Sequence, residues 1–217
     1  MYFILSFFVG VLMMNVQHDA IHRNKHWITS IITCGWYLKP FHAMHHKNFL
    51  EGEDDFSWAR KNESFYKFFK RTHLKRRVMA GKKSFILDML SFSVMSYFFG
   101  WYYIVIVISF TFHWEIFEYW SHYALKGITK DKFKWSWNVL GKKFNYLMLG
   151  LGYHSKHHLK KIGRFPVIYN VDFKSLMHIY LPLMPKKYFR FMNKQILINK
   201  KKGILWAFYL ELLSHLF

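Results

Sequence analysis

The sequence is short of cysteine, and several common motifs are missing from it. A single cysteine, Cys34, stands in 217 residues, so an internal disulfide and any Cys-x-x-Cys metal or redox motif are excluded. No glycine-rich dinucleotide fingerprint occurs, which indicates that the chain brings no nicotinamide or flavin domain of its own. His-Glu-x-x-His is missing too, so a zinc metalloprotease would lack its general base.

Acidic side chains are also scarce. There are 12 Asp and Glu against 32 Lys and Arg, a formal net charge of +20, yet 53% of the chain is hydrophobic and 22% aromatic. These values suit a nucleic-acid binder, a membrane-surface protein, or an integral membrane protein with a basic cytoplasmic face. The basic residues are dispersed between apolar segments, which argues against a nucleic-acid module. We therefore expect an integral membrane protein.

Two apolar runs are candidates for crossing a membrane. Residues 1–17 carry no charged side chain, and residues 89–114 form an uncharged run of 26. Because a spanning helix needs about 20 apolar residues, the second run is the stronger candidate. The shorter runs 26–38 and 203–210 favour re-entrant or interfacial placement. The first run lacks the basic region and cleavage site of a signal peptide, so we expect it to be retained.

The fold is expected to be helical. Lipid requires backbone groups to be hydrogen-bonded internally, and no alternating segments typical of a membrane barrel occur. We predict an all-α integral membrane helical bundle that forms one domain over residues 1–217. Basic blocks at 39–83, 126–145 and 156–202 place their side of the bundle in the cytoplasm by the positive-inside rule.

Histidine, in contrast, is plentiful, with 14 in the chain. The histidines are grouped as one HxxxH and two HxxHH patterns. On a helix, positions i, i+3 and i+4 share a face, so each group can direct several imidazole nitrogens to one point. The groups are His18 with His22, His42 with His45 and His46, and His154 with His157 and His158.

Eight imidazoles exceed the capacity of one metal ion and suit two. A structural zinc takes four ligands, and imidazole also binds copper, iron and nickel. His122, just beyond the long apolar run, is a ninth candidate. Three nearby carboxylates are expected to accept hydrogen bonds from the imidazoles and to orient them; they are Asp19, Asp54 and Asp55. The isolated histidines are expected to lie in the core or to face headgroups.

These patterns resemble the histidine boxes of the integral-membrane fatty-acid desaturase and hydroxylase superfamily. The residues in and around the patterns are similar to its alkane 1-monooxygenase branch. HDAIHR resembles that branch's His-Glu-x-x-His-Lys box, with Asp19 in place of Glu. EGEDDFSWARKNESFYKFFKRT (51–72) is similar to the stretch after its second box. EYWSHYA matches an Asn-Tyr-x-Glu-His-Tyr-Gly signature at His122, and HSKHHLKKIGRFPVIYN is close to its last box. The chain departs from the branch at Phe41, Ser121 and Ala124.

The resemblance implies a di-iron centre, held by the nine histidines at the cytoplasmic end of the bundle in a bacterial inner membrane. It implies a monooxygenase that uses O2 to hydroxylate a C–H bond of an alkane or other lipophilic alkyl substrate, with no catalytic residue beyond the metal ligands. Electrons would come from rubredoxin or ferredoxin with its reductase, and Lys160, Lys161 and Arg164 would attract an acidic carrier. The aromatic run 97–103 would line the substrate channel or form an interfacial belt.

Other functions remain open from the sequence. A lipid-modifying desaturase or a carotenoid ketolase of the same superfamily would use the same histidine boxes. A non-catalytic membrane metal-binding or transport protein is another class, although transport sites usually lie near the bilayer midplane and these histidines adjoin basic segments. An inactive relative that binds iron without turnover is a further alternative.

Overall fold

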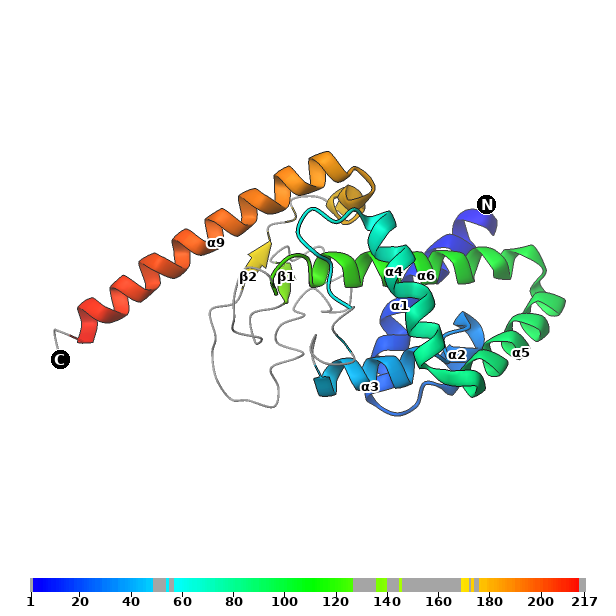
Figure 1. The fold of residues 1–217 in the computed structure, drawn as a ribbon. Coiled ribbons are helices and arrows are strands. Elements are labelled where there is room, and N and C mark those ends of the chain that lie inside the picture. Colours follow the sequence, from blue (N-terminus) through cyan, green and yellow to red (C-terminus); the bar gives the residue numbers. More distant parts are fainter. Residues whose placement is uncertain are drawn as a thin grey trace. The chain divides into compact units, whose positions relative to one another are not determined.

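The structure is a computed structural model, and it describes residues 2–48, 54, 57–126, 136–139, 145, 169–171, 173 and 176–214, with residues 169, 176–177 and 203–214 as backbone only. The described residues are mostly helical, which confirms the predicted all-α class (Figure 1). The chain divides into two compact units, Met1–Trp120 and Ser121–Phe217. The prediction of one domain over the whole chain stays a prediction.

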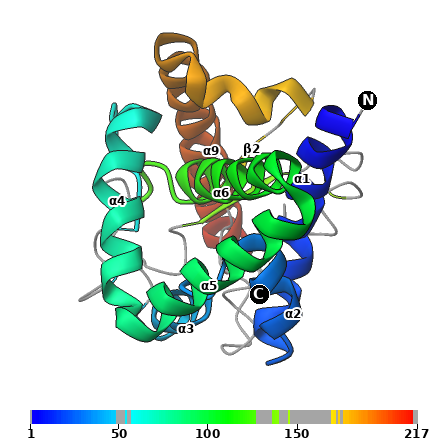
Figure 2. The same ribbon diagram turned by 90° about the vertical axis from the view of Figure 1, so that its right-hand side faces the viewer.

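The first unit is a set of packed helices. Helix α6 is seen nearly end-on in Figure 2, with α4 on one side of it and α1 on the other. Short turns join α1 to α2 and α2 to α3, where Cys34 ends α2 in the left-handed conformation. The helices are α1 (Tyr2–His22), α2 (Trp27–Thr33), α3 (Leu38–Asn48), α4 (Phe65–Met79), α5 (Gly81–Phe99) and α6 (Trp101–Ser121).

The uncharged run 89–114 is not one continuous helix, and this corrects the expectation of a single span there. Gly100 separates α5 from α6 with φ 58° and ψ −146°, a conformation that a residue with a Cβ rarely adopts. The two helices turn back on one another at this glycine (Figure 1). Within the described part of the chain, α1 is the helix with the length and apolarity to cross a membrane.

Three helices of the first unit carry large apolar side chains on their outer faces. Phe8 on α1, Leu90 on α5 and Ile108 on α6 are each more than half exposed. Extended apolar surfaces of this kind are rare on soluble monomers and mark contact with a partner or with lipid. This surface supports the predicted membrane association, because it lies on the same apolar segments.

The aromatic run 97–103 lies mainly on this outer surface. Tyr97 is 84% exposed and Phe98 is 70% exposed, whereas Tyr103 is buried. The ring of Trp101 lies 6.1 Å from that of Phe3, near the beginning of α1. Outward-facing aromatic rings gathered at one end of apolar helices are typical of an interfacial belt, so the geometry favours the belt over a channel lining.

Gly10 allows α1 and α6 to approach closely. A Cβ at this position would lie 2.6 Å from the Ile106 carbonyl oxygen and 2.6 Å from the Ser109 Cβ. The Ser109 hydroxyl donates a hydrogen bond to the Phe7 carbonyl oxygen at 2.7 Å. Small residues at such crossings let helix backbones pack against each other in membranes. The contact fixes α1, whose last two turns carry two of the predicted metal ligands.

Replacing Gly10 by leucine is therefore expected to destabilise the first unit by about 1–3 kcal/mol, the usual cost of overpacking. Thermal unfolding of the detergent-purified protein measures the loss as a lower melting temperature. Leu12→Phe is the matched control, since it adds bulk to α1 at a side chain that is 50% exposed. Equal melting temperatures for Gly10→Leu and the wild type would contradict the close contact.

The second unit contains a short parallel strand pair and a long helix. Strand β1 (Trp137–Val139) pairs with β2 (Tyr169–Val171) in register from Trp137 opposite Tyr169. The 3-10 helix η3 (Leu176–Leu183) precedes α9 (Pro185–Ser214). The Asn199 side chain on α9 accepts from the Asn170 backbone N–H at 3.0 Å and donates to its carbonyl oxygen at 2.7 Å. This pairing anchors β2 to α9.

Candidate metal centre

Two helices of the first unit bring four histidines together. His18 and His22 lie four residues apart in the last turns of α1. His42 and His46 have the same spacing on α3. The HxxxH pattern and the first HxxHH pattern therefore fall on helices, as the sequence predicts, and each pair presents two imidazoles on one face.

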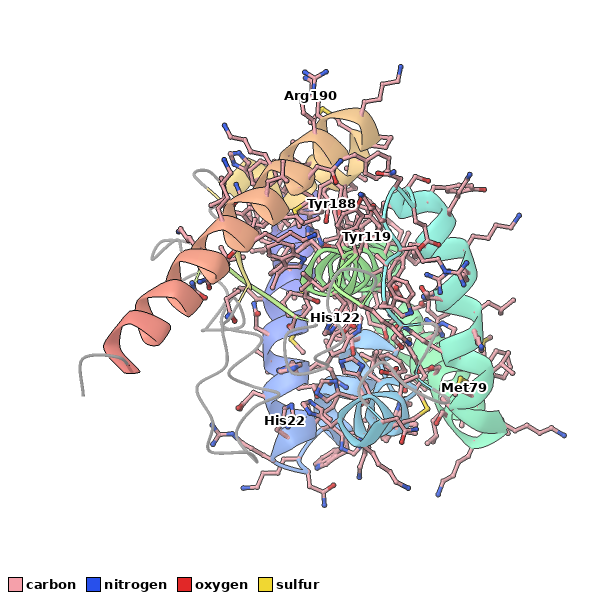
Figure 3. All side chains as sticks on the ribbon, turned by 60° about the vertical axis from the view of Figure 1, so that its left-hand side comes forward. His22, Met79, Tyr119, His122, Tyr188 and Arg190 are labelled. Atoms are coloured by element: carbon pink, nitrogen blue, oxygen red, sulfur yellow. The ribbon has the colours of Figure 1, made fainter. Side chains whose placement is uncertain are left out.

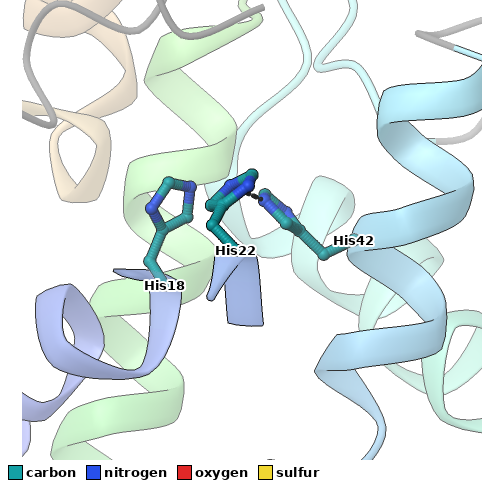
Figure 4. Close-up of side chains that lie close together, drawn as sticks. All are labelled: His18, His22 and His42. Carbon is teal, nitrogen blue, oxygen red and sulfur yellow. Dashed lines mark hydrogen bonds between the residues drawn. The ribbon is translucent and has the colours of Figure 1, made fainter. Parts of the chain in front are cut away.

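The imidazole nitrogens of these histidines are in direct contact. The Nε2 atoms of His22 and His42 lie 2.8 Å apart, and those of His42 and His46 lie 3.0 Å apart. One nitrogen each from His18, His22 and His42 all fall within 4.8 Å of one another. Figure 4 shows the three rings converging from α1 and α3. Sequence segments 20 residues apart thus form one nitrogen-rich cluster.

This cluster suits a transition-metal ion in its chemistry and its spacing. Imidazole nitrogen binds zinc at about 2.0–2.1 Å, so two ligands of one ion lie about 3.0–3.4 Å apart. The observed 2.8 and 3.0 Å separations are close to that range. Iron, copper and nickel also accept imidazole. Small adjustments of the rings would admit an ion among His18, His22 and His42.

Burial keeps the central histidine in the form that binds metals. His42 is 1% exposed, and this burial, together with the neighbouring imidazoles of His18, His46, His45 and His22, holds its pKa well below the ordinary value. A neutral imidazole is the ligand form, because a protonated nitrogen has no lone pair to donate.

His45 is directed to a different set of groups from His42. Its Nδ1 lies 2.7 Å from Oδ2 of Asp54, and both side chains are fully buried. Burial would lower the pKa of His45, but the charge and hydrogen bond of Asp54 outweigh it and raise that pKa. The Ser57 hydroxyl donates to the other Asp54 oxygen. Asp54 therefore orients the His45 ring so that its Nε2 is the nitrogen available in principle to a metal.

Exchanging Asp54 for asparagine is expected to weaken metal binding by about 10–100-fold, the usual cost of losing a carboxylate that orients a ligand histidine. Metal titration of the purified protein measures this change. Glu63→Gln is the matched control. The Glu63 carboxylate pairs with Arg71 at 2.8 Å, away from the histidines, with 11% of its side chain exposed. Equal weakening by both substitutions would show that loss of negative charge, rather than orientation of His45, is responsible.

A buried charged group lies beside the histidines, and the sequence reasoning missed it. Arg76 on α4 donates a hydrogen bond to Glu115 on α6 at 2.7 Å, and both are fully buried. His73 contacts the other oxygen of Glu115 at 3.0 Å, so this isolated histidine has a charged partner. The Arg76 guanidinium also lies 4.6 Å from the centre of the Phe41 ring. Such a network joins α3, α4 and α6 around the cluster.

Glu118 is the second carboxylate that the sequence reasoning overlooked. It lies one turn beyond Glu115 on α6 and is 1% exposed. One of its oxygens and a nitrogen of His45 are within 4.8 Å of each other. The available signal was the pair of glutamates, spaced i and i+3, in the otherwise uncharged helix 101–121. Tyr119, next to Glu118, donates a hydrogen bond to the Glu63 carbonyl oxygen, which fixes this turn of α6. Figure 3 shows Tyr119 on α6.

Of the remaining predicted site residues, the structure describes His122 and Asp19. His122 is buried at the start of the second unit, directly after α6. Asp55 and the late histidine group lie outside the described residues, as do the three basic residues proposed for carrier docking. Asp19 is paired with Arg23. The late histidine group is His154, His157 and His158, and the basic residues are Lys160, Lys161 and Arg164. The roles of all these residues, in a metal site or in carrier docking, stay predictions.

A comparison with known proteins finds a match in the first part of the chain. Residues 1–93 match the family model described as fatty acid desaturase. No curated protein matches the chain significantly. The matched segment contains α1 and α3, and with them His18, His22 and His42. This match supports the membrane desaturase and hydroxylase superfamily, whose members are oxygen-dependent oxidoreductases with di-iron centres, and it does not distinguish the alkane monooxygenase branch.

Proposed function

We propose that this chain is a membrane non-haem di-iron monooxygenase that hydroxylates a C–H bond of an alkane or other lipophilic alkyl substrate. The observation that carries the proposal is the convergence of His18, His22 and His42 from two helices, inside the segment that matches the desaturase family. The exposed apolar faces of α1, α5 and α6 support delivery of a lipophilic substrate from the bilayer.

The residues of the first unit would divide the work of holding two metals. His18, His22 and His42 would bind one ion, and His45, oriented by Asp54, would contribute to the second. His122 and the late histidine group would complete the ligand set. Bound iron would supply the activation of O2. The task of the chain is to hold the ions in fixed positions, to exclude water and to orient the substrate carbon.

Electrons have to come from another protein. No flavin, nicotinamide or cysteine-cluster motif occurs in the sequence. We propose an acidic carrier such as rubredoxin or ferredoxin, supplied by its reductase. The high positive charge of the chain supports this choice, because opposite charges steer two proteins together and accelerate their encounter.

The location follows from the same distribution of charge. Helix α4 ends in Arg76 and Arg77, and α5 begins with exposed Lys82 and Lys83. Basic residues beside apolar helices favour the cytoplasmic side of a membrane. We therefore propose a bacterial inner-membrane protein with its histidines toward the cytoplasm.

Desaturation is the second candidate function, favoured by the description of the matching family. Incubation of membranes that contain the chain under 18O2, with reduced carrier and a linear alkane, a saturated fatty acyl substrate or a carotenoid, separates the reactions. An alcohol that carries one 18O atom is the expected product. An alkene without 18O would identify a desaturase, and an oxygenated carotenoid under the same conditions would identify a ketolase. No product from any of these substrates would favour a metal-binding protein without catalysis.

A further inference from the structure

Glu118 lies where a carboxylate can reach a metal ion bound by His45. Both residues are buried in the first unit, on α6 and α3. Their potential ligand atoms lie within 4.8 Å, which is compatible with two ligands on one ion at about 2.0–2.2 Å each. The Asp54 contact occupies the Nδ1 atom of His45, so Nε2 is the nitrogen with which that ring would bind. Histidine and glutamate can therefore meet at one point.

Three acidic side chains are buried in this region. Asp54, Glu115 and Glu118 are at most 1% exposed, and the positive charge of Arg76 acts on all three. Buried carboxylates are costly unless they are compensated. A divalent cation beside His45 and Glu118 would add positive charge near them.

Arg76 is positioned to compensate Glu115 more directly than Glu118. Its guanidinium hydrogen-bonds to Glu115 at 2.7 Å but lies 3.9 Å from the Glu118 oxygen, beyond hydrogen-bonding distance. The two glutamates thus occupy different positions around one arginine, one turn apart on the same helix. Glu115 completes an internal ion pair, and Glu118 is directed to the neighbourhood of His45.

We propose that Glu118 is a carboxylate ligand of the metal ion that His45 binds. The inference rests on the proposed di-iron function and adds one oxygen donor to its histidines. The ion at His18, His22 and His42 would then have an imidazole environment, and the ion at His45 a mixed one. Mixed imidazole and carboxylate ligands are the donor set of many non-haem iron sites.

The test uses the full chain in detergent, loaded with Co2+ as a spectroscopic probe and separately with Fe2+. Visible absorption reports the ligands of cobalt, and mass spectrometry counts the metals per chain. Glu118→Gln is expected to change the cobalt spectrum and to weaken binding of one of the two ions at least tenfold. Glu115→Gln is the matched control, because it also removes one buried negative charge beside Arg76. It is expected to keep two ions and the wild-type spectrum.

The outcomes separate the two levels of the proposal. A wild-type chain that binds no metal would overturn the proposed function itself. A wild-type chain with two metals, and a Glu118→Gln variant with the same affinity and spectrum, would overturn the role of Glu118 alone. Equal losses in both glutamine variants would also overturn it, since the effect would then pass through Arg76. If Glu118→Gln does not fold, Glu118→Asp is the second variant, because it retains the negative charge but its shorter side chain moves the carboxylate oxygens away from the metal. Metal binding at the wild-type affinity by Glu118→Asp would overturn the assignment.

Discussion

Replacing His42 by alanine is expected to abolish metal binding at the histidine cluster and to reduce turnover by more than about 100-fold. Even the loss of a group that only orients a metal ligand costs about 10–100-fold, and His42 contacts both His22 and His46 through its Nε2 atom. It is the central member of the cluster, so no neighbouring ring can take its place without moving a helix. Metal content and 18O incorporation into product are the two measurements.

His26→Ala is the control for this substitution. His26 also belongs to the first unit, and it precedes α2 rather than facing the cluster. It is expected to leave the metal content unchanged, because its imidazole lies beside Trp36. If the His42 variant retained wild-type metal and activity, the cluster would not be the functional site.

Replacing Arg76 by methionine is the substitution with the largest expected effect on stability. It would leave Glu115 and Glu118 buried without their shared cation, and breaking a buried ion pair from one side costs about 3–5 kcal/mol. Methionine retains an unbranched apolar stem, so lost packing against Phe41 and Phe68 contributes less than the uncompensated charge. A fall in melting temperature of roughly 10 °C or more is expected for a chain of this size.

A second substitution tests the cause. Adding Glu115→Gln to Arg76→Met removes one of the stranded charges, so the double variant should recover part of the lost stability. Lys70→Ala is the control on the same helix, since this exposed lysine on α4 is expected to change stability by less than about 1 kcal/mol. No recovery in the double variant would mean that the loss comes from packing.

Several features of the fold could be predicted from local patterns. The apolar runs and their lack of barrel alternation predict helices, because in lipid the backbone has few other ways to satisfy its hydrogen bonds. The i, i+3 and i+4 spacing predicts that His18 and His22 share one face, and the structure places them in contact with His42. Asp54 is predicted to accept a hydrogen bond from an imidazole, and its carboxylate lies 2.7 Å from Nδ1 of His45; its role beside a metal stays a prediction.

The break at Gly100 shows why other features could not be predicted. An uncharged run of 26 residues is long enough for one span, and a glycine within a helix is tolerated at a cost of about 1 kcal/mol. The choice between a continuous helix and a turn depends on the packing partners of each half. Here Tyr103 and Ser109 contact α2 and α1, and this packing favours a turn.

The charged network around Arg76 could not be predicted from the sequence either. The departure from the alkane 1-monooxygenase pattern at Phe41 has a physical counterpart, since this ring lies against Arg76. Neither residue indicates the other in the sequence, because they lie 35 positions apart and on different helices. The proximity of Glu118 to His45 is likewise a product of helix packing, which no spacing rule describes.

The sequence by itself determined the class of the protein and the chemistry of its donors. Apolar length, basic excess and clustered histidines are local or compositional properties, and they predict membrane helices with imidazole at their ends. Only the tertiary structure decided which donors meet. It brought α1 and α3 together at His22 and His42, and it enclosed Arg76 between α3 and α6. The physical reason is that buried polar groups must find partners, and those partners come from distant segments that only packing brings within reach.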